Sequence, residues 1–289
     1  MFHVETKDIN FKNKLFNGNE KFPTNSQYDI LYNKEWGIAK TVFKKVKKSE
    51  NFIPTTEYLP HSKTKYTLIS LLYSMIRRLM FSYKYKMIGK FLPKGSKILD
   101  VGSGTGEFLL YMKKKLHDVY GLEPNKSARD ISKNNGILPF ENLKQSKGIK
   151  YKAITLWHVL EHLEDPITAI RSFNKMLDKN GILILAVPNL ESHDAVYYKK
   201  SWAALDIPRH LWHFTPKGLL KIVEQEGFKQ MKIFPLWFDT LYISYLSEKS
   251  RLNKFSIFRG LFKGIYFNLK SFKTQKYSSL TFVFRKTTP

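Results

Sequence analysis

The sequence predicts an α/β protein built on a doubly wound, largely parallel sheet. The segment from Lys97 to Val101 indicates a buried strand that turns on glycines into a helix from Glu107. The run from Ile182 to Asn189 is apolar on both faces, as parallel strands covered by helices require. Strand and helix patterns alternate along the rest of the chain, which favours the doubly wound arrangement.

Each further element has its own signal. A helix over 64–90 is predicted because apolar residues recur three and four positions apart. Thr215 is expected to cap a helix over 216–226 that ends at Gly227. The other predicted elements are helix 107–113, strand 118–124, helix 127–134, a weak strand 136–140, strand 151–157, helix 166–177 and closing strands 228–236 and 279–285.

The chain is expected to divide into two parts. Residues 1–65 are polar and rich in aromatic residues, and we expect an irregular accessory segment there, as an N-terminal extension. Residues 66–289 form the main domain, with a helical insertion at about 238–277, before the last strand.

The glycine loop after the first of these strands indicates which ligand the sheet binds. Gly102, Gly104 and Gly106 alternate with other residues, with Asp100 before them and no lysine after them. Dinucleotide sites use G-x-G-x-x-G and phosphate loops end in G-K-[ST], so neither pattern fits. A carboxylate here suits an ammonium or sulfonium group better than phosphates. The alternative is an ordinary glycine turn. The segment resembles motif I of the class I S-adenosylmethionine-dependent methyltransferases, so these residues and Ser103 are expected to bind that cofactor.

A second acidic residue ends the next predicted strand. Glu123 follows Gly106 by 17 residues, and a carboxylate there can accept hydrogen bonds from both hydroxyls of a ribose. We expect Pro124 to belong to the same site, Asn142 or Leu143 to contact the adenine, and Trp157 to form a wall on the methionine or substrate side. S-adenosyl-L-methionine is therefore the predicted cofactor.

Composition limits the class of protein. The 289 residues are 43% hydrophobic, enough for a real core, and the absence of cysteine excludes disulfides and thiolate zinc sites. The net charge of +25 reflects a lysine excess, since only 8 of the 49 basic residues are arginine. Phosphate or base recognition would favour arginine. The chain shows neither a secretory signal nor the ~20 apolar residues of a membrane span, so we expect a cytoplasmic protein.

Two histidine-rich blocks follow predicted strands at the edge where a substrate must lie. The first, Trp157–Pro166, reads W-H-V-L-E-H-L-E-D-P, and the second runs from Trp202 to Pro216. The first resembles the V-L-E-H-x-x-D-P motif of a broad methyltransferase group that includes ubiquinone O-methyltransferase-like enzymes. With Tyr58–Ser62 and Ser278–Leu280, the blocks resemble a bacterial subgroup of that family over essentially the whole chain. Members of this subgroup often carry N-terminal cysteine pairs, which are absent here.

The expected reaction is an in-line methyl transfer. The protein must align the acceptor, exclude water and, for a hydroxyl, remove a proton. A neutral histidine suits this last task. His162 is the first candidate base, followed by His158, His210 and His213, because all four fall in blocks expected to converge on one cleft. Each of them could instead be a hydrogen-bonded structural residue.

The same blocks offer a ligand set for a divalent metal. His158, Glu161 and His162, with His210 or His213, resemble the E-x-x-E-H and downstream histidine of small-RNA ribose 2′-O-methyltransferases, with His158 in place of the first glutamate. A metal could bind the acceptor oxygen and lower its pKa. In the alternative, Glu161 and His162 only cap or hold the following helix, so the sequence leaves metal binding open.

The predicted helical insertion also has an unusual pattern of basic and apolar residues. No acidic residue occurs from Lys249 to the end of the chain, and the eight basic residues over 249–276 alternate with aromatic and aliphatic ones. Such a basic amphipathic helix pair can make peripheral contact with an anionic membrane. We favour the other interpretation, a lid helix whose apolar face packs on the core.

These observations predict an S-adenosylmethionine-dependent methyltransferase that acts on an oxygen of a small molecule, glycan or lipid-linked intermediate. One alternative is an RNA methyltransferase, although nothing in the sequence resembles an RNA-binding module. The other is a non-catalytic module that binds membrane surfaces through 249–276, against which the intact glycine motif argues.

Overall fold

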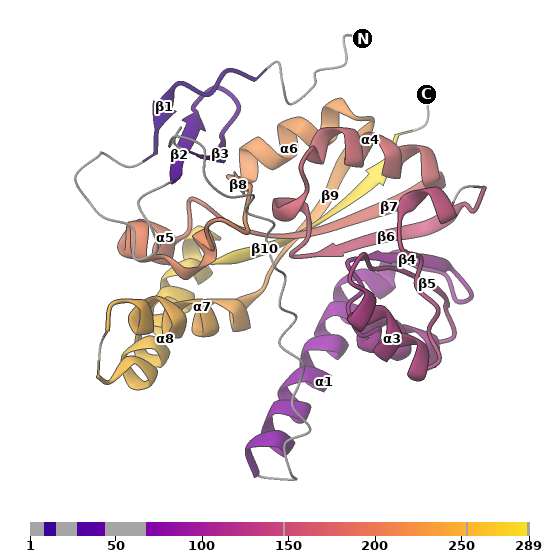
Figure 1. Ribbon diagram of the computed structural model, residues 1–289, viewed down its shortest axis with the longest axis horizontal. Coiled ribbons are helices and arrows are strands. Elements are labelled where there is room, and N and C mark those ends of the chain that lie inside the picture. The colour runs from indigo at the N-terminus through magenta and orange to yellow at the C-terminus, as the bar shows by residue number, and fades with distance from the viewer. Residues whose placement is uncertain (1–8, 16–27, 44–67, 147, 253, 288–289) are drawn as a thin grey trace.

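A six-stranded sheet lies at the centre of the protein, with helices on both faces (Figure 1). The computed structural model describes residues 9–15, 28–43, 68–146, 148–252 and 254–287, and of residues 68–76 it describes only the backbone. The strand order is β5 (Asp118–Leu122), β4 (Lys97–Val101), β6 (Tyr151–Trp157), β7 (Leu177–Pro188), β10 (Ser279–Lys286) and β9 (Phe228–Pro235). The first four strands are parallel, and β10 runs antiparallel to both of its neighbours. The predicted α/β class is confirmed.

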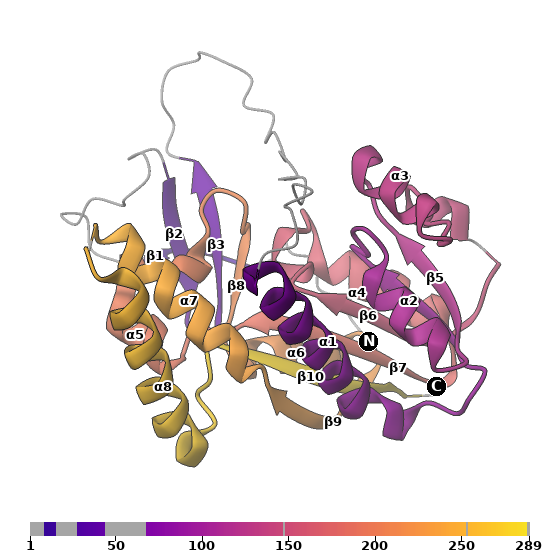
Figure 2. The ribbon, with the colours of Figure 1, turned by 90° about the horizontal axis from the view of Figure 1, so that it is seen from below.

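The two faces of the sheet are covered separately, because side chains alternate along each strand. In β7, Ile182 and Ile184 belong to one apolar cluster, whereas Leu183 and Leu185 belong to the other. The first face is covered by α1 (Leu68–Ile88) and α2 (Glu107–Lys114), and the second by α4 (Pro166–Met176) and α6 (Pro216–Gln225) (Figure 2). The sheet is therefore buried on both sides, and ligands can approach it only at its edges.

The structure differs from the predicted elements in three places. The expected strand over 136–140 is reduced to a single bridge between Leu122 and Phe140, because Pro139 has no N–H to donate. Strand β7 begins at Leu177, not at Ile182. Helix α5 (His193–Tyr198) was not predicted, because its six residues are too few to show a helical period. The predicted helix after β5 is confirmed as α3 (Lys126–Asn134).

Part of the expected irregular N-terminal segment forms a second sheet. Strands β2 (Tyr28–Asn33) and β3 (Ile38–Phe43) form a hairpin. Strand β1 (Asn13–Lys14) pairs with β2 and strand β8 (Trp212–Phe214) pairs with β3 at the two edges of this sheet. The expectation of irregular structure was wrong for 28–43, since this segment pairs over six residues. Strand β8 belongs to the second histidine block, so the N-terminal sheet adjoins the region where an acceptor is expected.

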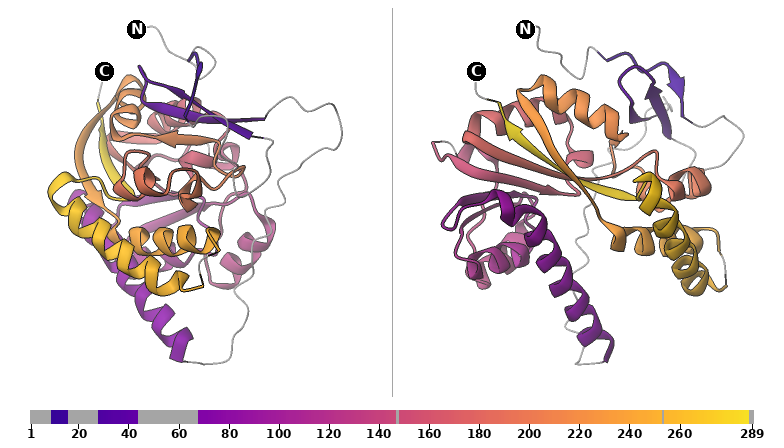
Figure 3. Two further views of the ribbon diagram at one scale, coloured as in Figure 1. Left: turned by 90° about the vertical axis from the view of Figure 1, so that its left-hand side faces the viewer. Right: turned by 180° about the vertical axis from the view of Figure 1, so that it is seen from behind.

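The predicted insertion is a helical hairpin of α7 (Trp237–Ser250) and α8 (Ser256–Thr274). Glycines allow the two helices to touch closely: a Cβ on Gly260 would lie 2.4 Å from the Cα of Tyr245. The hairpin lies at the opposite end of the molecule from α3 (Figures 1 and 2), and the views of Figure 3 show it standing out from the sheet.

Candidate cofactor and acceptor site

The glycine loop leaves the carboxyl edge of β4 in a conformation that favours glycine. Gly102, Gly104 and Gly106 have φ values of +71°, +55° and +77°. At Gly102 a Cβ would also lie 2.4 Å from Val159 Cγ2. The loop therefore presents backbone rather than side chains to a ligand, and it packs directly against the first histidine block.

The carboxylate of Glu123 is fixed beside this loop. It lies just after β5, where Oε2 accepts a hydrogen bond from the Gly104 amide at 2.8 Å and Oε1 accepts one from the Asn125 amide at 2.8 Å. A carboxylate has about four acceptor positions, so each oxygen keeps one for a further donor. The side chain is thus held in place with free acceptor capacity at the edge of the sheet.

Asp100 lies beneath the loop and is buried. It accepts a hydrogen bond from the Thr155 hydroxyl at 2.5 Å, across the β4–β6 pair. Burial raises the pKa of Asp100 to about 7, although the Thr155 hydrogen bond and the charge of Lys84 oppose this. A cation placed beside Asp100 would favour its charged form.

A cationic side chain that was not predicted as a site residue, Lys84, lies near Asp100. The Nζ atom of Lys84, on α1, is 4.2 Å from the centre of the Trp157 ring and 5.6 Å from that of Phe108. Burial lowers the pKa of Lys84, while the nearby charges of Asp100 and Asp239 raise it. These aromatic faces and carboxylates form a surface suited to positive charge. No sequence signal distinguishes Lys84, because α1 also contains Arg77, Arg78 and Lys86.

The other residues expected to bind the cofactor differ in their burial. The Ser103 hydroxyl and Trp157 Nε1 are buried and have no hydrogen-bond partner among the described residues. Pro124 and Asn142 are exposed, and Asn142 Oδ1 accepts a hydrogen bond from the Lys144 amide. Contact of Asn142 with an adenine therefore stays a prediction.

His158 sits between two carboxylates. Its Nε2 is 2.8 Å from Asp239 Oδ2, on α7, and its Nδ1 is 3.3 Å from Glu161 Oε1. Burial disfavours the charged imidazole, but the opposite charge of Asp239 and the hydrogen bonds outweigh this and raise the pKa of His158 to about 10. At neutral pH His158 is an imidazolium with both nitrogens engaged. This geometry argues against His158 as a base or a metal ligand.

His213 is engaged by the N-terminal sheet. It is buried in β8, and its Nε2 is 2.9 Å from the hydroxyl of Thr41, on β3. Burial lowers the pKa of His213 to about 3. His213 therefore joins the N-terminal sheet to β8 as a neutral structural residue.

Glu161, His162 and His210 form a compact group, which we call the histidine cluster. One possible ligand atom from each residue lies within 4.8 Å of the others. The Nδ1 of His162 is 3.0 Å from the Arg209 carbonyl, and that of His210 is 2.9 Å from the Ala204 carbonyl. Each Nδ1 must carry a proton to donate to its carbonyl, so each neutral ring keeps its lone pair on Nε2. This is the arrangement of histidines that bind metals.

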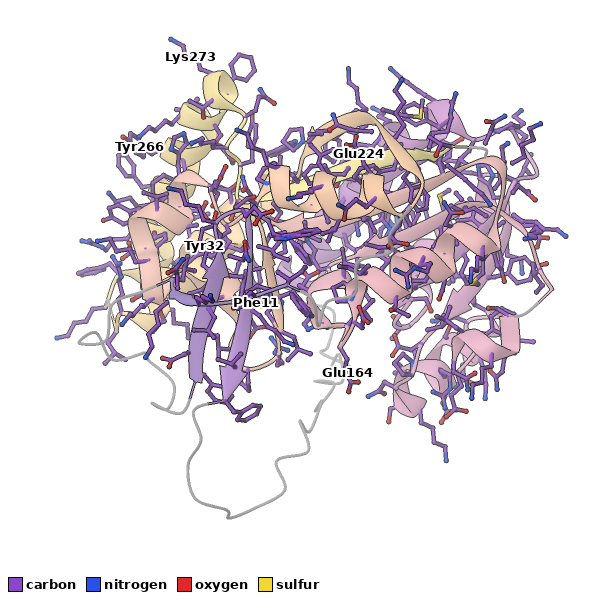
Figure 4. The ribbon with its side chains drawn as sticks, turned by 90° about the horizontal axis from the view of Figure 1, so that it is seen from above. Phe11, Tyr32, Glu164, Glu224, Tyr266 and Lys273 are labelled. Carbon is purple, nitrogen blue, oxygen red and sulfur yellow. The ribbon has the colours of Figure 1, made fainter. Side chains whose placement is uncertain are left out.

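Glu161 completes the histidine cluster with negative charge. The residue is 1% exposed, and its Oε2 has no hydrogen-bond partner among the described residues. Burial raises its pKa, but the His158 hydrogen bond and charge outweigh this, so the net pKa is lowered. By contrast, Glu164 in the same block points away from the body of the protein (Figure 4). The cluster can therefore hold a divalent cation through one oxygen and two nitrogens.

The histidine cluster and the glycine loop meet at one sheet edge. Cluster residues Glu161 and His162 lie in a 3₁₀ turn (Leu160–His162) that follows β6 and begins one residue after Val159, which contacts Gly102. The Leu211 amide donates to the Glu161 carbonyl at 2.8 Å and fixes the second block beside the first. The structure thus brings Glu161 and His162 of the first block together with His210 of the second.

Comparison with known proteins identifies the family of this chain. The methyltransferase domain family matches residues 73–232, more than half of the chain. A ubiquinone biosynthesis O-methyltransferase of Aliivibrio fischeri (strain MJ11) is 25% identical over 172 residues, which cover 54% of this chain and 74% of that protein. Its counterpart from Haemophilus ducreyi is 28% identical over 202 residues, 62% of this chain and 81% of that protein.

Solved structures share the fold at low identity. The mycolic acid cyclopropane synthase CmaA1, complexed with SAH and CTAB, superposes with a TM-score of 0.53 at 14% identity, covering 73% of this chain and 85% of that one. A SAM-dependent methyltransferase from Thermotoga maritima superposes with a TM-score of 0.51 at 14% identity, covering 76% and 95%. The chain belongs to the methyltransferase domain family and is a class I, S-adenosylmethionine-dependent methyltransferase.

Proposed function

We propose that this methyltransferase acts on a hydroxyl oxygen of a small or lipid-linked acceptor, and that the acceptor binds at the histidine cluster. One observation carries the proposal: Glu161, His162 and His210 bring possible ligand atoms within 4.8 Å of one another beside the glycine loop. The names of the relatives, as O-methyltransferases of ubiquinone biosynthesis, support oxygen as the acceptor atom.

The residues around the loop fit S-adenosylmethionine. Glu123 keeps one acceptor position on each oxygen for the ribose hydroxyls, and buried polar atoms of Ser103 and Trp157 lack partners among the described residues. The Asp100 carboxylate beneath the loop suits the positive charge of the amino acid end. When bound, this cofactor supplies a methyl group on a positively charged sulfur. The chain's own task is to hold donor and acceptor in line and exclude water.

On the acceptor side, Glu161, His162 and His210 would hold a divalent metal. Such an ion lowers the pKa of a hydroxyl bound to it, so the acceptor oxygen becomes nucleophilic at neutral pH. Nitrogen and carboxylate ligands suit zinc, manganese or iron. Without a metal, the exposed His162 still presents a free Nε2 lone pair, and it would then be the base that takes the proton.

Elemental analysis of the purified protein and methyl transfer from labelled cofactor would test both parts. The acceptors are a panel of hydroxylated aromatic compounds, glycans and a lipid extract. We expect close to one metal ion per chain, loss of it in His210→Ala, and retention in the control His193→Ala. Full activity after chelation with no bound metal would reject the metal and leave His162 as the base. Labelling of nitrogen or carbon products alone would reject O-methylation.

A further inference from the structure

Helix α8 carries an apolar face that is turned outward. Phe258, Phe262, Ile265, Leu269 and Phe272 follow one another at intervals of four and three residues and are 53–76% exposed. At about 100° per residue they fall within a stripe about 80° wide. Isolated exposed apolar residues are common, but a continuous aromatic stripe of this kind marks an interaction surface.

The opposite side of α8 is the one that packs on the protein. Its buried residues are Gly260, Gly264, Phe267 and Ser271, which face α7 and α5. The lid interpretation, in which the apolar face packs on the core, is therefore wrong for α8. Small residues make the intramolecular contact and large apolar residues point outward.

Positive charge borders the exposed stripe. Lys263, Lys270 and Lys273 lie on one flank of α8, and Tyr266 and Lys273 reach the outer edge of the molecule (Figure 4). Arg259 lies on the same flank, although its guanidinium pairs with Glu248 at 3.2 Å. No acidic residue occurs on α8 or between it and the end of the chain. A partner that binds this surface must therefore offer both an apolar region for the stripe and negative charge for the lysines.

We propose that the outer face of α8 docks on the surface of an anionic lipid membrane. An interfacial helix has this pattern: aromatic and aliphatic residues enter the acyl boundary while lysines remain at the headgroups. Among the described helices, none combines the length and hydropathy needed to cross a bilayer. Contact is thus peripheral, through α8. A second copy of the chain would also cover apolar residues, but it would bring like charges together.

The docking surface is coupled to the site through α7. Asn268 of α8 donates a hydrogen bond to the Trp237 carbonyl at 2.8 Å, two residues before Asp239, which holds His158. Only α7 therefore lies between the outer face of α8 and the His158 side of the candidate site. If the proposed hydroxyl acceptor is correct, this placement favours an acceptor with a membrane-held apolar part.

Sedimentation of the full chain with lipid vesicles tests the docking. One set contains phosphatidylcholine alone and the other also contains phosphatidylglycerol. We expect binding to the anionic set only, weakened by salt because surface charges are screened. Phe258→Ser with Phe262→Ser should weaken binding by at least roughly tenfold for each phenylalanine removed. Leu138→Ser, at a residue 77% exposed beyond α3, is the matched control and should bind as the parent does.

Each other outcome has a defined meaning. Failure to bind anionic vesicles, or binding that the double serine variant retains, overturns the proposal. A dimer in solution that the double variant converts to monomer, without vesicle binding, assigns the face to a second copy instead. Unchanged affinity of the double variant for S-adenosylhomocysteine shows that it is folded. Vesicle binding does not require turnover, so a failure of the proposed acceptor chemistry leaves this result unaffected.

Discussion

Asp100 should make cofactor binding depend on pH. Burial raises its pKa to about 7, so much of the free protein carries a neutral Asp100 just below neutrality. A cationic ligand binds best to the ionised carboxylate. At lower pH the Asp100 carboxyl group must therefore lose its proton before the ligand binds at full affinity. Binding should therefore weaken as the pH falls through 7.

The size of this effect follows from the pKa. With a pKa near 7, the ionised fraction of Asp100 falls about 25-fold between about pH 7.5 and about pH 5.5. The affinity for S-adenosylhomocysteine should fall by a similar factor if only the ionised form binds. In Asp100→Asn the dependence should disappear, and the affinity at pH 7.5 should drop towards that of the parent at low pH.

Calorimetric titration across this pH range measures the effect directly. Asp130→Asn, at an exposed acid on α3, is the matched control and should keep the dependence of the parent protein. An affinity that does not change with pH in the parent would refute the reasoning. So would a pH dependence that persists unchanged in Asp100→Asn.

Two further substitutions test the packing around the loop. Gly102→Ala should lower the free energy of unfolding, measured by urea titration, by about 2–4 kcal/mol. The cause is that the new Cβ would lie 2.4 Å from Val159 Cγ2 and that φ at this position is +71°. A loss below about 0.5 kcal/mol would contradict this. His158→Ala leaves Glu161 and Asp239 without their partner and should cost about 1–3 kcal/mol, moderated because His158 is 35% exposed. The pKa of His158 is raised from 6.5 to about 10, so this stabilisation is complete below about pH 6.5 and is lost as the pH rises to about 10. The melting temperatures of the parent and the His158→Ala variant should converge over that pH range. A difference between them that stays constant with pH would contradict a charged His158 paired with Glu161 and Asp239.

The sequence predicted most of the parallel sheet because its signals are local. Strand β6 matches its predicted range of 151–157, and α6 begins after its predicted Thr215 cap. The pairing of the N-terminal hairpin with β8 was missed because β8 lies more than 160 residues beyond β3 along the chain. Pairing between such distant segments leaves no periodic trace in either one.

The candidate site was predictable where one motif defines it and unpredictable where distant groups meet. The glycine loop and Glu123 lie together as expected. The four histidines were chosen for their residue type and their place in the two blocks, and only their partners in the structure distinguish them: Asp239 engages His158, and Thr41 engages His213. Asp239 lies more than 70 residues from the block it contacts, so nothing in the local sequence marks it.

The direction of the apolar face of α8 is the other feature that the pattern left undecided. Helical spacing shows that Phe258, Phe262 and Leu269 share a face, but it does not show whether that face is covered. Gly260 and Gly264 decide this, because their lack of a side chain makes the opposite face the one that approaches α7.

Calorimetric titration of S-adenosylhomocysteine into the parent protein and Glu123→Ala tests the central claim most directly. The carboxylate of Glu123 lies against the Gly104 amide with acceptor capacity for ribose hydroxyls, so the parent should bind and the variant should bind at least roughly tenfold more weakly. Glu224→Ala, on α6 (Figure 4), should bind as the parent does. No binding by the parent, or equal affinity in Glu123→Ala, would contradict the assignment of this edge of the sheet to the methyl donor.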